Sequence, residues 1–343
     1  MTKPSHKDRL QFSANFLSAI DFITLVFCGW ILLYMSLGIM RVQDAEIHIP
    51  IYLGVAISVL ILAWWQRQLD MVLTLAVNAK NTTGAGKNNQ NKRNSGASAL
   101  QHINSTKSSR IYIPILLFIR SIYPVFLFGY FFTSSHTFNR ILFTSWQDPF
   151  FMQIDKAIFG YYPSLSWGVN FAYPAMQELF HFAYFCYYPM ILGLPVYLYF
   201  KQPKAFRELI FNLTFVFYLC YTIYSVLPVI GGRFIPEAME ITQTYRAGLF
   251  THIMVFIYRT SNHLGGAFPS SHIAITLVLT VAALRYLKRM GYVFAIIAFF
   301  LSIATVYCHY HWFIDAVFGI LTGIMGYYLA NYVRGRLANL GFH

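Results

Sequence analysis

The residues best suited to chemistry lie in three short segments of the second half of the chain. His311 and Asp315 stand four positions apart, at the start of an apolar stretch at 312–333. Residues four apart share one helix face, so Asp315 can accept a hydrogen bond from one ring nitrogen of His311 and leave the other nitrogen free. A histidine held in this tautomer is suited to act as a nucleophile or a base.

The second segment is Phe268-Pro-Ser-Ser-His272, which opens another apolar stretch at 269–287. Proline is favoured in the first turn of a helix, and the unsatisfied amides of a helix N-terminus form a natural phosphate cradle. Ser270 and Ser271 add hydroxyls, and His272 is placed to protonate a leaving alkoxide as a general acid. Serine also caps helices through the same amides, so the sequence leaves both roles of these serines open.

The third segment carries Arg233, which follows two glycines in Tyr224-x3-Pro228-x2-Gly-Gly-Arg233. A guanidinium binds two phosphate oxygens at once. Together the three segments offer a nucleophile, an acid and a charge stabiliser, which predicts phosphoryl transfer.

The amino-acid composition indicates that the helices carrying these residues lie in a lipid membrane. Of the 343 residues, 57% are hydrophobic and only 11% are charged, which is typical of a membrane protein. A membrane helix needs about 20 apolar residues. Eight stretches qualify, so we predict an all-α polytopic membrane bundle of about eight helices. The stretches are 16–39, 50–66, 111–132, 176–199, 206–229, 269–287, 292–309 and 312–333.

The basic residues predict the orientation, because short loops rich in lysine and arginine stay on the cytoplasmic side. If the amino terminus is inside, the inner segments carry 18 of the 25 basic residues. Both termini are then cytoplasmic, and all three segments lie at the extracytoplasmic face. The net charge of +13 does not indicate nucleic-acid binding, since the basic residues lie between apolar segments.

A polar segment divides the chain into parts. Residues 78–110 are rich in Asn, Ser, Gly and Lys, which is typical of a disordered cytoplasmic loop. We therefore predict an N-terminal pair of transmembrane helices at 1–77, a six-helix catalytic membrane core at 111–333 and a cytoplasmic tail at 334–343.

Two motifs resemble those of a known family. Phe268-Pro-Ser-Ser-His272 is similar to the P-S-G-H motif of the type 2 phosphatidic acid phosphatase superfamily, and His311-x3-Asp315 is similar to its terminal histidine-aspartate pair. Within that superfamily, Tyr224-x3-Pro228-x4-Arg233 and the stretch Asp155-Lys-Ala-Ile-Phe-Gly160-Tyr-Tyr-Pro163-Ser are more similar to the inositol phosphorylceramide synthase branch. The resemblance covers roughly residues 140–333.

The resemblance implies a role for each residue. His311 would be the nucleophile that forms a phosphohistidine, Asp315 its partner and His272 the acid and base. Arg233, Ser270 and Ser271 would clamp the phosphate of a lipid substrate. The resemblance implies neither a metal nor another cofactor.

Departures from the motif bear on the substrate. Val226 and Thr305 stand where the phosphatase pattern has a lysine and an arginine, and Ser271 replaces its glycine. Two missing cations weaken binding of a phosphomonoester dianion more than that of a singly charged diester. We therefore expect a phosphodiester donor or a phosphotransferase acting on a lipid-linked phosphate.

Three alternatives stay open at this stage. A lipid phosphate phosphatase would differ only in using water as the acceptor. A metal-dependent hydrolase would use His309, His311 and Asp315 as ligands. A membrane transporter would place polar residues through the bilayer midplane, whereas the residues above concentrate at one interface.

Overall fold

A computed structural model describes residues 16–81, 107–243, 248–259 and 263–342. Every regular element in these ranges is helical, and only one isolated bridge, between Val229 and Gly266, pairs extended backbone. The prediction of an all-α bundle is confirmed. Most of the loop predicted at 78–110 lies outside the described residues.

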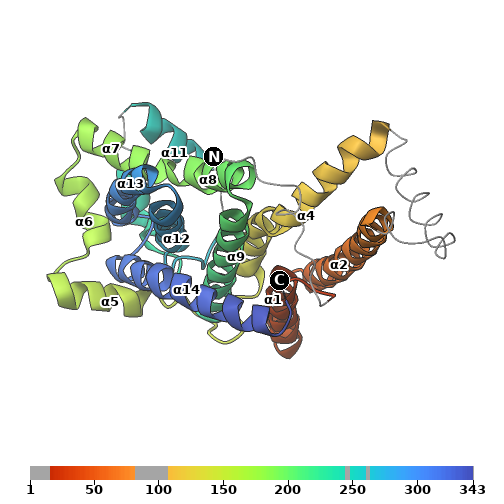
Figure 1. Ribbon diagram of the computed structural model, residues 1–343. Coiled ribbons are helices and arrows are strands. Elements are labelled where there is room, and N and C mark those ends of the chain that lie inside the picture. Colours follow the sequence, from red (N-terminus) through yellow and green to blue (C-terminus); the bar gives the residue numbers. More distant parts are fainter. Residues whose placement is uncertain (1–15, 82–106, 244–247, 260–262, 343) are drawn as a thin grey trace, which may run out of the picture.

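The described helices follow one another along the chain in the order shown in Figure 1. They are α1 (Ala19–Leu37), η2 (Ile39–Arg41), α2 (Ala45–Asn81), α4 (Lys107–Ser134), η5 (Ser135–Thr137), α5 (Asp148–Phe159), α6 (Pro163–Asn170), α7 (Pro174–Phe185), α8 (Tyr187–Lys201), α9 (Pro203–Val226), η6 (Gly232–Phe234), α10 (Pro236–Gln243), α11 (Leu249–Arg259), α12 (Ser271–Tyr286), α13 (Lys288–Tyr307) and α14 (Phe313–Asn339).

Seven segments of the described chain are long and apolar enough to cross a membrane. One of them is the pair α7 and α8, which together match the predicted stretch at 176–199. The predicted stretch at 269–287 corresponds to α12, which has 16 residues and is shorter than the others. Ser270 is extended at its start and Leu287 leaves the helical conformation at its end, so the helix covers less of the apolar stretch than predicted.

Helix α12 lies at the centre of the core, where it packs on α8, α9, α13 and α14. Figure 1 shows α5 and α6 on one side of this core and α2 and α4 on the other. Glycines bring α14 close to α12, because a Cβ on Gly319 would lie 2.8 Å from the Ser270 carbonyl oxygen and one on Gly323 would lie 2.8 Å from that of Ala274. The start of α14 is therefore held directly against the start of α12.

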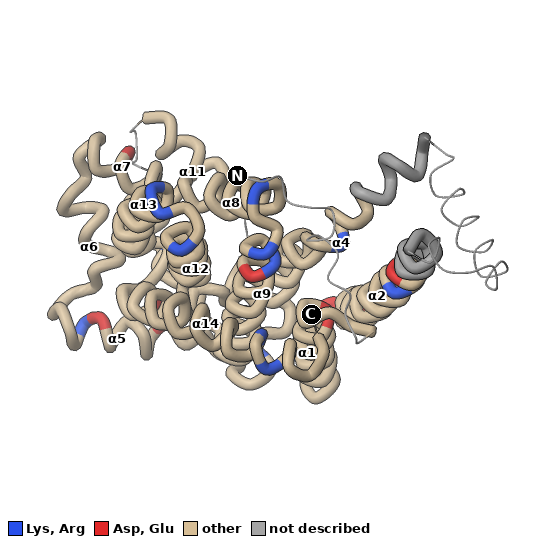
Figure 2. Tube along the Cα trace, in the orientation of Figure 1, with Lys and Arg blue, Asp and Glu red and all other residues tan. Residues whose placement is uncertain are grey.

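Charged residues are sparse along the helices (Figure 2). Arg120 of α4 is buried and pairs with Asp21 of α1, which ties α1 to α4. At the far ends of α12 and α14, Arg285 and Arg334 donate to Glu208 of α9 at 2.7 and 2.8 Å. The opposite end of these three helices carries the candidate site.

Candidate active site

The three segments singled out in the sequence meet at one end of the core. The amide of Ala267 donates to the carbonyl of Val229 at 2.9 Å, which joins the segment after α9 to the one before α12. The amide of Ser270 donates to the carbonyl of Asp315 at 3.1 Å, which joins α12 to α14. Residues far apart in the sequence thus form one compact end of the bundle.

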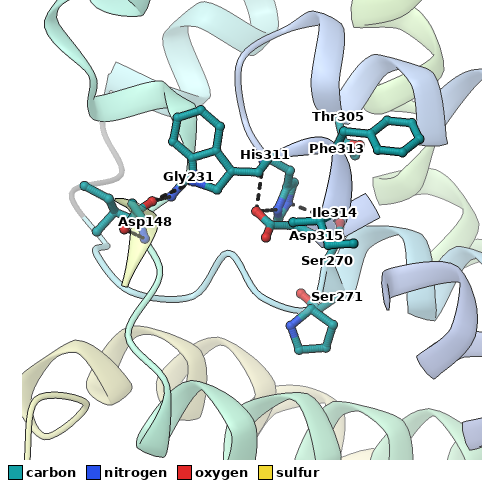
Figure 3. Close-up of polar contacts among 12 residues, drawn as sticks. Asp148, Gly231, Ser270, Ser271, Thr305, His311, Phe313, Ile314 and Asp315 are labelled. Atoms are coloured by element: carbon teal, nitrogen blue, oxygen red, sulfur yellow. Dashed lines mark hydrogen bonds and ion pairs between the residues drawn. The ribbon is translucent and has the colours of Figure 1, made fainter. Parts of the chain in front are cut away.

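His311 lies in the turn between α13 and α14 and is only 5% exposed. Its Nε2 is 3.2 Å from the Ser270 hydroxyl, and its Nδ1 is 3.7 Å from Oδ2 of Asp315 (Figure 3). The second distance is longer than a hydrogen bond. One ring nitrogen of His311 therefore faces the Asp315 carboxylate and the other faces the Ser270 hydroxyl.

Burial sets the protonation state of this histidine. It lowers the pKa of His311 to about 4, and a backbone contact with Ala267 offsets part of the effect. The imidazole is consequently neutral at pH 7, which is the form that carries a nucleophilic lone pair.

His272 lies in the first turn of α12, beside His311. The centroids of the two imidazole rings are 6.4 Å apart. Tyr184 and Tyr187 flank the His272 ring, with centroid distances of 4.9 and 4.6 Å. The structure thus brings together the two histidines predicted from the sequence.

Arg233 lies in η6, where its guanidinium is held against aromatic rings. It is 4.5 Å from the ring centroids of both Phe234 and Tyr258, and Nη2 donates to the Tyr258 carbonyl at 2.8 Å. Burial lowers the pKa of Arg233, although a guanidinium remains charged in proteins. The Tyr258 hydroxyl bonds that of Tyr184, which packs on His272, so two tyrosines connect Arg233 to the histidines.

The start of α12 differs from the phosphate cradle predicted from the sequence. The amide of Ser270 is already bonded to Asp315, and that of Ser271 donates to the Tyr224 hydroxyl at 3.2 Å. The Tyr224 hydroxyl in turn donates to the Pro269 carbonyl at 2.8 Å. These two amides do not point outward as expected, because neighbouring helices have supplied their acceptors. The Ser270 side chain does not cap the helix but faces His311.

Carboxylates surround the start of α14 instead. Asp155 of α5 accepts from the amides of Phe313 and Ile314 at 2.7 and 3.0 Å, and Oδ2 of Asp315 accepts from that of Trp312 at 2.9 Å. Burial raises the pKa of Asp155, while its two backbone hydrogen bonds oppose the change. Asp155 thus anchors the helix that follows His311.

Asp148 of α5 is a further buried carboxylate that the sequence did not reveal. It accepts from the amides of Ile230 and Gly231 at 3.0 and 2.8 Å and from Nε1 of Trp312 at 2.8 Å (Figure 3). Burial raises the pKa of Asp148, and these bonds act in the opposite direction. The only sequence signal in α5 was the family-like stretch that begins at Asp155.

The remaining polar residues near the turn have structural partners. His309 is fully buried in a left-handed conformation with φ of 65°, and its Nδ1 bonds the Ser164 carbonyl. Within the described ranges, no three His, Cys, Asp or Glu side chains are grouped to hold a metal, so His309, His311 and Asp315 do not form a ligand set. Thr305 is buried, and its carbonyl accepts from the His311 amide at 3.0 Å.

Fold and site together define a polytopic helical membrane protein with histidines, serines and an arginine gathered at one end of its core. The family model of the PAP2 superfamily matches residues 150–329, just over half of the chain, and the chain belongs to this superfamily. A PA-phosphatase related-family protein of Dictyostelium discoideum is 40% identical over 50 residues, which span 15% of this chain and 9% of that protein. No solved structure matches the chain. The resemblance to the inositol phosphorylceramide synthase branch stays a prediction.

Proposed function

We propose that this protein is a lipid headgroup phosphotransferase that works through a phosphohistidine at His311. The observation that carries the proposal is the placement of this buried, neutral histidine between Ser270 and Asp315, with His272 beside it. Membership of the PAP2 superfamily supports a phosphatase or phosphotransferase acting on lipid phosphates.

In the first step, Nε2 of His311 attacks the phosphorus of the donor lipid. A P–N bond forms, the P–O bond to the lipid alcohol breaks, and His272 passes a proton to the leaving oxygen, which it recovers from the acceptor in the second step. Asp315 faces Nδ1–H of His311, where its carboxylate orients the ring and stabilises the positive charge that forms on it. In the second step His272 takes the proton of an acceptor hydroxyl, whose oxygen attacks phosphorus as the P–N bond breaks.

Arg233, Ser270 and Ser271 are the proposed phosphate-binding residues. Charge on the equatorial phosphate oxygens needs preorganised donors, and Arg233 is held in place by its rings and by the Tyr258 carbonyl. Val226 and Thr305 contribute no charge where the phosphatase motif has cations. A phosphodiester donor with a single negative charge fits this set better than a phosphomonoester.

A lipid phosphate phosphatase is the second candidate, because the Dictyostelium relative is a PA-phosphatase related-family protein. The two candidates share the first step and differ only in the acceptor. Neither requires a metal, so we expect activity to persist in chelator.

The test is to incubate the purified protein with a donor lipid labelled in its headgroup phosphate, with and without candidate alcohols. We expect label to move to an alcohol, and a protein-bound label that is stable in alkali and lost in acid. His311→Ala should abolish both, whereas His252→Ala, which changes an exposed histidine of α11, should abolish neither. Label released only as free phosphate would favour the phosphatase, and full activity of His311→Ala would overturn both candidates.

A further inference from the structure

Helix α5 lies outside the predicted membrane spans but presents one face to the site. Phe151 and Asp155 are 4% and 0% exposed, while Phe150 and Ile158 are 61% and 56% exposed. The helix is therefore amphipathic, with its inner face against the end of the core. This buried face carries two carboxylates, those of Asp148 and Asp155, in addition to apolar side chains.

Asp148, the first residue of α5, bridges two segments that are distant in the sequence. It is 4% exposed and accepts three hydrogen bonds, two from the loop after α9 and one from the Trp312 indole. Hydrogen bonds to an ionised acceptor are about twice as strong as neutral ones. Three such hydrogen bonds, donated by two different segments to one carboxylate, hold these segments at a fixed distance from each other.

Each of these donors is next to a residue of the proposed machinery. Ile230 and Gly231 directly precede η6, which carries Arg233, and Trp312 directly follows His311. The loop also lies against the histidine turn, since a Cβ on Gly231 would be 2.5 Å from the Tyr310 carbonyl oxygen. Asp148 thus holds the backbone on both sides of the site without using its own atoms on a substrate.

We infer that Asp148 is a positioning residue that keeps Arg233 in register with His311. The inference rests on the proposed function, in which Arg233 binds the phosphate that His311 attacks. A displacement of about 1 Å between such groups is enough to cost roughly 10²-fold in rate. Asp155 is the matched control, because it lies on the same buried face of α5 but bonds only the amides at the start of α14.

The first experiment is a double-mutant cycle on the purified full-length protein. Asp148→Asn replaces one acceptor oxygen with a donor and should lower kcat/KM for the labelled donor lipid by about 30- to 100-fold, mainly through KM. If Asp148 acts through Arg233, then adding Asp148→Asn to Arg233→Lys should cost less than about threefold more. Asp155→Asn should lower kcat/KM by less than about fivefold. Fully additive losses in the double variant would overturn the inference.

The second experiment does not depend on activity. Hydrogen–deuterium exchange should be faster at the amides of Ile230 and Gly231 in Asp148→Asn than in the wild type, and unchanged there in Asp155→Asn. Orthovanadate should bind Asp148→Asn about as weakly as it binds Arg233→Lys. Unchanged exchange at both amides would overturn the inference, even if the His311→Ala result had already overturned the proposed function.

Trp312→Phe serves if Asp148→Asn does not fold, because it removes one donor and leaves the carboxylate in place. It should weaken vanadate binding by about three- to tenfold, and this loss should again disappear in an Arg233→Lys background. Wild-type vanadate affinity in folded Trp312→Phe would contradict the bridge.

Discussion

The N-termini of α12 and α14 meet in the same site but are capped in opposite ways. At α14 the amides of Trp312, Phe313 and Ile314 all donate to carboxylates, those of Asp315 and Asp155. The positive end of the α14 dipole is thus neutralised by the protein itself.

At α12 the acceptors are neutral. The amide of Ser270 donates to a backbone carbonyl and that of Ser271 to the Tyr224 hydroxyl. The positive end of this helix dipole is therefore not matched by a carboxylate at these amides.

The difference indicates the side from which an anion approaches. Asp148, Asp155 and Asp315 are close enough to interact electrostatically, and they occupy the donors at the start of α14, so a phosphate finds few free donors there. The start of α12 carries no such charge at its amides and places Ser270 against His311. Under the proposed function, the start of α14 orients His311, and the phosphate approaches His311 from the start of α12.

The largest effect is expected for Asp315 of α14, which has a proposed role in the reaction. Asp315→Asn removes the charge that favours a proton on Nδ1 of His311, so we expect kcat to fall by about 10³-fold, or about 4 kcal/mol. Single-turnover rates with the labelled donor would measure this, with thermal melting as a check of folding. A rate within tenfold of the wild type would show that Asp315 serves only to cap α14.

The next effect would come from making the α12 end resemble the α14 end. Ser271→Asp adds a carboxylate in the first turn, where it suits the helix dipole but repels a phosphate. We expect kcat/KM to fall by about 10²-fold, and the melting temperature to fall as well because Ser271 is buried. Ser271→Ala is the control and should lose less than about tenfold. Equal losses in the two variants would contradict the proposed approach of the anion at α12.

The pH profile of kcat/KM tests whether burial keeps His311 unprotonated. Only unprotonated His311 can attack, and because its pKa is lowered to about 4, the reactive form persists into acid. We expect kcat/KM to lose no activity from this group between pH 7 and pH 5, and to fall about tenfold per unit below about pH 4. A fall in kcat/KM that begins near pH 6.5 would show instead that His311 is exposed to solvent.

The smallest effect is expected for Asp155→Asn. Two hydrogen bonds to the amides of Phe313 and Ile314 would be weakened, so the free energy of unfolding should fall by about 1–2 kcal/mol. Thermal or denaturant melting in detergent would measure this. A loss of activity as large as that of Asp315→Asn, with unchanged stability, would give Asp155 a catalytic role and remove the distinction between the two carboxylates.

The sequence predicted the helical fold and the three segments that meet at the site, because both are encoded in local sequence patterns. Apolar length marks membrane helices, and short motifs such as His311-x3-Asp315 carry their geometry in their spacing. It missed Asp148 because the donors to this carboxylate lie 82 and 164 residues away, and no local pattern encodes such a contact. The sequence also predicted free amides at Ser270 and Ser271. This prediction was wrong because the acceptors come from α14 and α9, which only tertiary packing brings to these amides.

The shortness of α12 has a consequence for how a lipid reaches the site. Its 16 residues span about 24 Å, whereas the hydrocarbon layer is about 30 Å thick. Arg285 near the far end is bonded to Glu208, and if this charged pair lies at the opposite interface, the deficit falls at His272. Under the proposed function, a substrate phosphate would then have to lie several ångströms below its neighbours, or the bilayer would have to thin around the helix. We therefore expect turnover to depend on the thickness of the membrane.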